Sequence, residues 1–191
     1  MELRWYQAEA KAAIYKYLET NAVGNPCAVL PTGAGKTPLL SAVCADVAGA
    51  WGGRELVLAH VKELLEQAAD ELQQFLPPNM VGVYSASLKS RDTNHAVILA
   101  QIQSVYRRAG ELGPFAVIIV DEAHLIPTHD GGMYRTFLDA MKVINPRVRI
   151  IGLTATPDRL DTGYICGPEN ILTEICYEVG VKELIVQGFL C

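Results

Sequence analysis

The sequence predicts an α/β fold in which a mostly parallel sheet carries helices on both faces. Three observations predict it. Short apolar runs typical of buried strands alternate with helical patterns along the 191 residues. A glycine-rich loop, Pro31 to Thr37, joins one such run to a helix. Asp121 and Glu122 follow a run of six apolar residues, at a strand end where open α/β sheets bind their ligands.

Composition restricts the class of protein. With 50% hydrophobic and 19% charged residues, the chain is expected to form a single globular domain over 1–191. No apolar run approaches the roughly 20 residues of a membrane span, and the first ten residues lack a signal-peptide pattern. We therefore expect no membrane association and a cytoplasmic protein, in the host cytoplasm if a phage encodes it.

Charge and cysteine content exclude further classes. The net charge of −5 argues against a protein that neutralises many phosphates, so any contact with nucleic acid must be local. The five cysteines include no C-x-x-C pair, which favours neither a disulfide framework nor a zinc site.

The first elements are predicted to be a helix, a loop and a strand. Apolar residues at three- and four-residue spacing predict an amphipathic helix over 3–18, within an N-terminal helical segment 1–20. Arg4 and Gln7 near its start fit surface positions, although an amide can also pair with both the donor and the acceptor edge of adenine. Turn residues over 20–26 lead into a strand at 27–30.

Later elements follow the same alternation. An apolar stripe over 39–47 predicts the helix behind the glycine-rich loop. Segment 101–109 is expected to begin as a loop and to become a short helix carrying Arg107 and Arg108. The remaining strands are expected at 55–59, 80–84, 96–100, 115–120, 148–153 and 173–179, and the remaining helices at 61–75 and 181–187.

The glycine-rich loop has the chemistry of a triphosphate site. Gly33 and Gly35 let backbone N–H groups turn towards an anion, and the helix behind adds the positive end of its dipole. Lys36 supplies a full charge, and the Thr37 hydroxyl can ligate Mg²⁺. The strict pattern has glycine where this chain has Leu30, and a merely solvated connection is the alternative. The predicted nucleotide-binding residues here are Thr32, Gly33, Ala34, Gly35, Lys36 and Thr37.

Two further strand ends carry polar residues. Asp121 can hold Mg²⁺ through water while Glu122 handles a proton, although acidic residues at a strand end also cap helices. The hydroxyls of Thr154 and Thr156 can bond His124 or the γ-phosphate region, although this segment alone reads as a turn.

Six motifs resemble those of superfamily 2 helicases, in the same order and spacing. They look like motifs Q, I, Ia, Ic, II and III of the first RecA-like domain, and they cover almost the whole chain. The DEAH form of motif II and the run over 154–160 look most like DNA repair and phage-type helicases. The motifs are Leu3-Arg4-x-Tyr6-Gln7, Pro31 to Thr37, Leu58-Ala59-His60 with Glu63-Leu64, Gln103-Ser104, Asp121-Glu122-Ala123-His124 and Thr154-Ala155-Thr156.

The resemblance implies how ATP and Mg²⁺ would be bound. Arg4 and Gln7 would bind adenine, and Lys36 and Thr37 would bind the phosphates and Mg²⁺. Asp121 would hold the metal from the other side. Pro38 departs from the expected pattern, because it removes an N–H from the first turn of the helix.

The resemblance also implies catalytic and coupling roles. Glu122 would position the attacking water, with Lys36 and His124 as the other catalytic residues. Thr154 and Thr156, with His124, would couple the nucleotide state to strand binding. The strand leading into Thr154 would lie between the strands that carry motifs I and II.

The resemblance of motifs Ia and Ic implies contacts with the nucleic-acid backbone, and DNA is the expected nucleic acid. Many relatives carry arginine where this chain has Val61, which leaves Lys62 as the nearest cation. The residues implied in these contacts are His60, Lys62, Gln103 and Ser104.

Superfamily 2 helicases close two RecA-like domains around ATP, and the second supplies motifs IV to VI with an arginine finger. Nothing after Thr156 resembles these motifs, and 173–191 resembles the segment that leads towards the second domain. We therefore expect the ATP-binding half of a nucleic-acid-dependent ATPase, helicase or translocase, which needs a second RecA-like domain in cis or in trans. The alternatives are a non-catalytic nucleotide- or partner-binding domain and a small P-loop kinase, which fits Glu122 and the Thr-Ala-Thr run less well.

Overall fold

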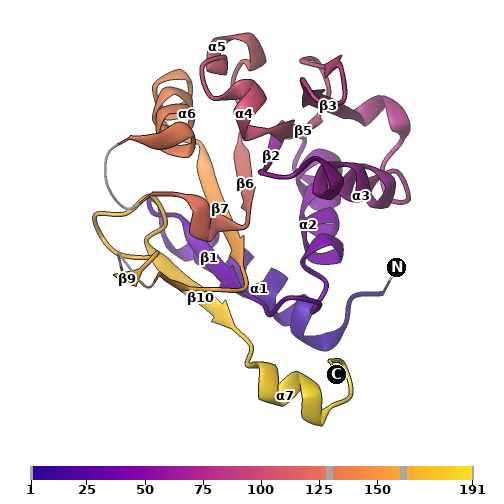
Figure 1. Ribbon diagram of the computed structural model, residues 1–191, viewed down its shortest axis with the longest axis vertical. Coiled ribbons are helices and arrows are strands. Elements are labelled where there is room, and N and C mark those ends of the chain that lie inside the picture. Colours follow the sequence, from indigo (N-terminus) through magenta and orange to yellow (C-terminus); the bar gives the residue numbers. More distant parts are fainter. Residues whose placement is uncertain (1, 128–130, 160–162, 191) are drawn as a thin grey trace.

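The computed structural model describes residues 2–127, 131–159 and 163–190, and its main sheet has the strand order β10-β1-β7-β6-β2-β5-β3-β4 (Figure 1). All neighbouring strands in it are parallel except β3 and β4 at one edge. The predicted mostly parallel α/β fold is confirmed. The strands are β1 (Pro26–Val29), β2 (Glu55–Ala59), β3 (Val81–Ser85), β4 (Ser90–Arg91), β5 (Val97–Gln101), β6 (Val117–Asp121), β7 (Arg149–Thr154) and β10 (Glu174–Glu178).

Strand β7 lies between β1 and β6, as the resemblance implies. In the parallel register Val29 is opposite Thr154, and Asp121 is opposite Leu153. The carboxyl ends of these three strands therefore meet at one edge of the sheet, which brings together segments about 30 and 90 residues apart in the chain.

The strands are buried on both faces because apolar side chains occupy both alternating positions. In β6, Val117 and Ile119 enter one apolar cluster, whereas Ile118 and Val120 enter the other. Successive side chains of a strand point to opposite faces, so a continuous apolar run requires cover on both sides.

One face is covered by α1 (Trp5–Thr20), α2 (Lys36–Ala45) and α3 (Lys62–Leu72), whose buried residues join a single cluster. Helix α2 continues as a π-helical turn over Asp46–Ala50. The other face is covered by α4 (Ile102–Val105), α5 (Ala109–Leu112) and α6 (Gly132–Ile144).

Two features of the second face differ from the sequence prediction. Arg107 and Arg108 lie in a turn between α4 and α5, so the expected single helix carrying them is wrong. The Arg108 N–H donates to the Val105 carbonyl at 2.7 Å, which closes α4 before it can continue. No element was predicted for 125–147, yet α6 lies there and buries an apolar stripe over 134–141.

The remaining elements are short. They are the 3₁₀ turns Pro78–Met80 and Ala123–Leu125, the hairpin β8 (Asp158–Arg159) and β9 (Gly163–Tyr164), and α7 (Val181–Val186). Leu160, in the run compared with helicases, and Cys191 lie outside the described residues. No helix of the described chain is long and apolar enough to cross a membrane.

Candidate functional site

The glycine-rich loop, Pro31 to Thr37, runs from the carboxyl end of β1 to the start of α2. Gly33 and Gly35 have φ values of 81° and 77°, a region that residues with a Cβ rarely adopt. The Ala34 N–H donates to the Pro31 carbonyl at 3.0 Å and closes the turn. Because α2 begins at Lys36, the loop ends at a helix N-terminus, where free N–H groups and the helix dipole favour an anion.

The start of α1 holds this loop in place. The Tyr6 hydroxyl donates to the Ala34 carbonyl at 2.9 Å, and the Gln7 amide donates to the carbonyls of Ala34 and Gly35 at 3.0 and 2.9 Å. A Cβ added at Gly35 would lie only 2.6 Å from Gln7 Nε2. Glycine at this position therefore serves both the left-handed turn and the close approach of α1.

These contacts restrict how Gln7 can meet a base. Both amide hydrogens are engaged by the loop, and Oε1 accepts the Arg4 N–H at 2.9 Å. An amide oxygen has two lone pairs, so Oε1 retains one acceptor position. Gln7 is only 3% exposed, and Nε2 could donate to another partner only by breaking a contact with the loop.

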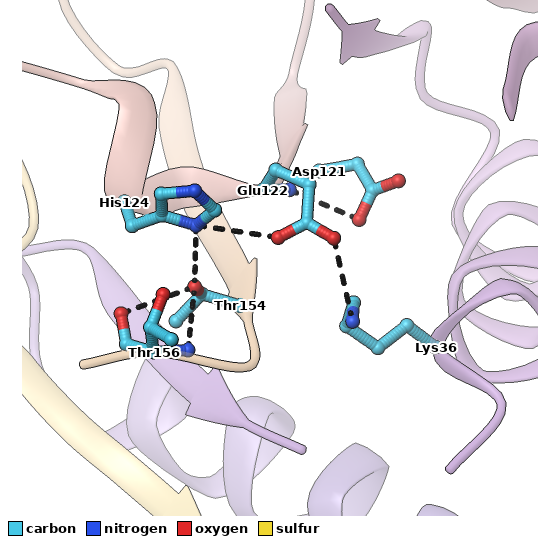
Figure 2. A network of polar contacts seen from close by, with 6 residues as sticks. All are labelled: Lys36, Asp121, Glu122, His124, Thr154 and Thr156. Carbon is cyan, nitrogen blue, oxygen red and sulfur yellow. Dashed lines mark hydrogen bonds and ion pairs between the residues drawn. The ribbon is translucent and has the colours of Figure 1, made fainter. Parts of the chain in front are cut away.

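Glu122 stands at the carboxyl end of β6 in a left-handed backbone conformation, with φ of 53°. A non-glycine residue in this region costs on the order of 1–3 kcal/mol and persists only where its surroundings impose it. Asp121 fixes the turn, since its Oδ1 accepts the Glu122 N–H at 3.0 Å. The strained turn directs the Glu122 carboxylate towards the glycine-rich loop (Figure 2).

Lys36 meets that carboxylate directly. Lys36 Nζ lies 3.5 Å from Glu122 Oε1, and the two side chains are only 12% and 28% exposed. An ion pair with this little exposure is screened less than a surface pair. The loop and the acidic strand end, predicted separately, therefore form one site.

The other oxygen of Glu122 continues the network (Figure 2). His124 Nδ1 lies 3.2 Å from Glu122 Oε2 and 3.0 Å from the Thr154 hydroxyl oxygen. That hydroxyl donates to the Thr156 carbonyl and accepts the Thr156 N–H, at 3.2 and 3.1 Å. Because a carboxylate only accepts and the hydroxyl hydrogen is already used, Nδ1 is the donor to both. Polar contacts thus run from Lys36 to Thr156 across three strand ends.

The acidic pair suits a divalent cation. Burial, reinforced by the charge of Glu122, raises the pKa of Asp121 above its usual value, and Lys36 opposes this only in part. A cation beside Asp121 would favour its ionised form. The Thr37 hydroxyl and Asp121 are oxygen ligands of the type Mg²⁺ prefers, and Mg²⁺ is commonly shared between few protein oxygens and substrate phosphates. Among the described residues, no three His, Cys, Asp or Glu side chains form a metal centre of their own.

Tyr134 lies near this site, and the sequence analysis did not single it out. It comes from α6 and is 4% exposed, and its buried hydroxyl has no hydrogen-bond partner among the described residues. Burial raises its pKa, and the charges of Asp121 and Glu122 raise it further, which places the phenol near the acidic pair. The signal was available, because Tyr134 begins the apolar stripe of α6.

The four residues compared with motifs Ia and Ic lie after β2 and β5, which are neighbours in the sheet. Gln103 Nε2 donates to the His60 carbonyl at 3.1 Å and contacts the His60 ring. The Ser104 hydroxyl accepts the Ala86 N–H at 2.9 Å. Lys62 pairs with Glu66 one helical turn away, at 3.7 Å. His60 and Gln103 are therefore brought into contact, and Ser104 supports the neighbouring turn.

A basic cavity adjoins Gln103 and Ser104. It has a volume of about 310 Å³ and lies between the β3–β4 hairpin and the turn after α4. Arg91, Arg107 and Arg108 line it, and Arg108 pairs with Glu111 at 3.0 Å. This acidic chain thus gathers positive charge at one place, next to two of the residues predicted to contact DNA.

Comparison of the sequence with models of protein families identifies the family of this chain. The profile of the family described as Type III restriction enzyme, res subunit, matches residues 1–159. The chain belongs to this family. Among curated proteins, no relative matches it. The family match and the structural neighbours below confirm the expected first RecA-like domain of the superfamily 2 helicase type.

Solved structures of similar fold include a nuclease-deletion mutant of the Type ISP restriction-modification enzyme LlaGI in complex with a DNA substrate mimic. It has a TM-score of 0.74 at 16% identity and covers 99% of this chain and 21% of that chain. The UvsW helicase from bacteriophage T4 has a TM-score of 0.69 at 17% identity. The match covers 93% of this chain and 60% of the UvsW chain.

The Hef helicase domain of Pyrococcus furiosus has a TM-score of 0.69 at 25% identity, with coverage of 92% and 37%. The chain thus spans less than two thirds of the length of each of these proteins. The matched family and these structural neighbours relate the chain to helicase-type ATPase domains and to DNA-related enzymes.

Proposed function

We propose that this chain is the ATP-binding half of a DNA-dependent ATPase, helicase or translocase, completed by a second RecA-like domain in cis or in trans. One observation carries the proposal: Lys36 of the glycine-rich loop lies 3.5 Å from Glu122 at the end of β6. A phosphate-binding lysine beside a strained carboxylate fits hydrolysis of a phosphoanhydride better than nucleotide storage.

In the proposed mechanism Lys36 exchanges Glu122 for the β- and γ-phosphates. The backbone N–H groups over 32–37 would bind the phosphate oxygens. Thr37 and Asp121 would hold Mg²⁺, which would supply positive charge beside those oxygens. Glu122, released from Lys36, orients a water molecule and accepts its proton. Arg4 and Gln7 contact the base.

The contacts of His124 would then transmit a movement of the Glu122 carboxylate to Thr154. Because Nδ1–H is shared between Glu122 and Thr154, a movement of the carboxylate changes the bond at β7. We propose that Thr154 and Thr156 pass this change to the DNA-binding edge. DNA would contact His60, Lys62, Gln103 and Ser104 there.

Paired variants test the proposed roles. Glu122→Gln keeps the shape of the side chain but cannot accept a proton, so ATP affinity should stay within about twofold while hydrolysis becomes undetectable. Lys36→Ala removes the phosphate contact and should weaken ATP by about a hundredfold or more, since several charge-assisted hydrogen bonds are lost. Calorimetric titration and single-turnover hydrolysis measure the two effects. Equal loss of binding in both variants would make Glu122 a structural carboxylate.

The same assays test the need for a second domain. An arginine finger contributes roughly 10³ to 10⁵ in rate in phosphate-loop enzymes, so the chain alone should bind ATP·Mg²⁺ weakly and hydrolyse it very slowly. Rapid turnover stimulated by single-stranded DNA in a purified monomer would contradict the half-enzyme proposal. Binding with no hydrolysis by the chain joined to a second RecA-like domain would favour a non-catalytic nucleotide-binding domain.

A further inference from the structure

The segment after α7 turns back onto the start of α1. Gly188 has φ of 75°, and the N–H groups of Phe189 and Leu190 both donate to the Leu184 carbonyl, at 2.8 and 3.2 Å. A left-handed glycine followed by such bonds is a common way to end a helix. The segment 188–190 therefore curls back from α7 (Figure 1).

Phe189 contacts two residues at the rim of the glycine-rich loop. Its ring meets the Tyr6 ring edge to face, with centroids 5.4 Å apart and planes at 74°. The Arg4 guanidinium lies over the same Phe189 ring, 5.3 Å from the centroid. Arg4 also donates to the Tyr6 hydroxyl at 3.0 Å, and that hydroxyl donates to the Ala34 carbonyl. One aromatic ring thus connects 188–190 with the support of the loop.

Leu190 lies against the loop itself. A Cβ added at Gly33 would lie 3.3 Å from Leu190 Cδ2. Phe189 and Leu190 both pack on the apolar cluster shared by α1 and α2. Leu190 therefore covers the part of the loop where Gly33 exposes its backbone.

We propose that Phe189 is a positioning residue for recognition of an adenine base, an inference that rests on the proposed ATP-binding function. Arg4 is exposed, so a planar base can stack on its guanidinium from the side that Phe189 does not cover. Phe189 holds the guanidinium plane in place, and the free lone pair of Gln7 Oε1 accepts the adenine amino group.

This arrangement links base binding to the position of the segment over 188–190. That segment follows β10, which pairs directly with β1, the strand that leads into the loop. Anything that shifts Phe189 would weaken the base contact, and by thermodynamic linkage a bound nucleotide would hold Phe189 in place.

Two ligands separate this role from general support of the loop. In Phe189→Ala, the affinity for ADP should fall about two- to fivefold, the range expected for one exposed cation–π contact. The affinity for inorganic tripolyphosphate should be unchanged, because this ligand has no base. Phe189→Tyr keeps the ring and should restore ADP binding. Val186→Ala, at an 86% exposed position three residues earlier in α7, is the matched control and should bind both ligands as the wild type does.

The opposite outcomes are distinct. Equal weakening of ADP and tripolyphosphate in Phe189→Ala would show that the segment supports the loop, and tighter ADP binding would show that it blocks the site; either result overturns the inference. If the wild type bound neither ligand, the proposed ATP-binding function itself would fail. Wild-type binding of tripolyphosphate with no gain from the adenosine of ADP would overturn only the base-recognition inference.

Discussion

At the amino ends of β2 and β7, two arginines donate to backbone carbonyl groups, whereas the charged side chains at the carboxyl edge contact one another. Arg149, the first residue of β7, donates to the carbonyls of Leu18, Asn21 and Gly24. Arg54, just before β2, donates to the carbonyls of Thr93, His95, Leu112 and Pro114. These arginines hold neighbouring backbone segments in place, and neither forms an ion pair with another described residue.

The carboxyl edge is arranged differently. Lys36, Glu122 and His124 contact side chains that can exchange partners, and Glu122 occupies a strained backbone conformation. The difference indicates that one edge is built for stability and the other for ligand chemistry. Substitutions at the amino edge should then change stability, and substitutions at the carboxyl edge should change binding.

The largest expected effect is at the amino end of β2. Glu55 is completely buried, and burial raises its pKa to about 8, with the Cys44 thiol opposing the shift. The folded protein therefore keeps this proton between pH 4.5, the ordinary pKa of the group, and about 8, whereas the unfolded chain releases it. The contribution of protonated Glu55 to the free energy of unfolding is fully present below pH 4.5. It is lost as the pH rises to about 8, by on the order of 5 kcal/mol.

The side chain of Glu55→Gln is neutral at every pH, so this variant should not lose stability as the pH rises to about 8. Urea unfolding of wild type and variant at several pH values should show a difference that grows in favour of the variant up to pH 8 and then levels off. Glu19→Gln, at an exposed position, is the control. Parallel stability curves for wild type and Glu55→Gln would contradict the assignment.

Arg149→Ala should have the next largest effect. It leaves three backbone carbonyls without this donor, so the free energy of unfolding should fall by about 2–4 kcal/mol. ADP affinity of the folded protein should not change, since the site is at the other edge. Arg147→Ala removes an exposed arginine two residues earlier and should cost less than about 0.5 kcal/mol. A large loss of ADP affinity in folded Arg149→Ala would break the separation of the two edges.

At Pro38, on the carboxyl edge of the sheet, a substitution should strengthen ligand binding instead of weakening it. It is the third residue of α2 and has no N–H to offer a phosphate. Pro38→Ala should therefore bind ADP roughly threefold to tenfold more tightly, with water replacing the missing donor in the parent. Thermal unfolding of the ligand-free protein should change little, because proline suits the first turn of a helix. Unchanged or weaker affinity in calorimetric titration would mean that this backbone position does not face the ligand.

The smallest expected effect concerns DNA. Lys62→Ala should weaken binding of single-stranded DNA about two- to fivefold while leaving ATP affinity unchanged, because one exposed phosphate contact is lost. Lys16→Ala, an exposed lysine of α1, is the control. For the parent, the slope of log K against log salt should be shallower than about −5, since each contact contributes roughly −0.7 to −0.9. A steeper slope would contradict sparse backbone contacts on this acidic chain.

The local parts of the fold could be predicted from the sequence. The apolar run before Asp121 defined β6, and the glycines of the loop defined the turn into α2, because burial and backbone freedom leave marks on consecutive residues. The apolar stripe of α6 is also visible in the sequence. However, Pro127, Gly131 and Gly132 at its start are residue types typical of loops. The resemblance to helicases supplied the place of β7, which spacing alone does not give.

Contacts between distant segments were decided only by the tertiary structure. Gln7 donates to the loop 27 and 28 residues away, Tyr134 comes from a separate helix to lie near the acidic pair, and Phe189 reaches Arg4 from the far end of the chain. Composition and periodicity record whether a residue is buried, but not which residue it meets. That choice depends on strand order and register, which together bring the strand ends and α7 to one edge of the sheet.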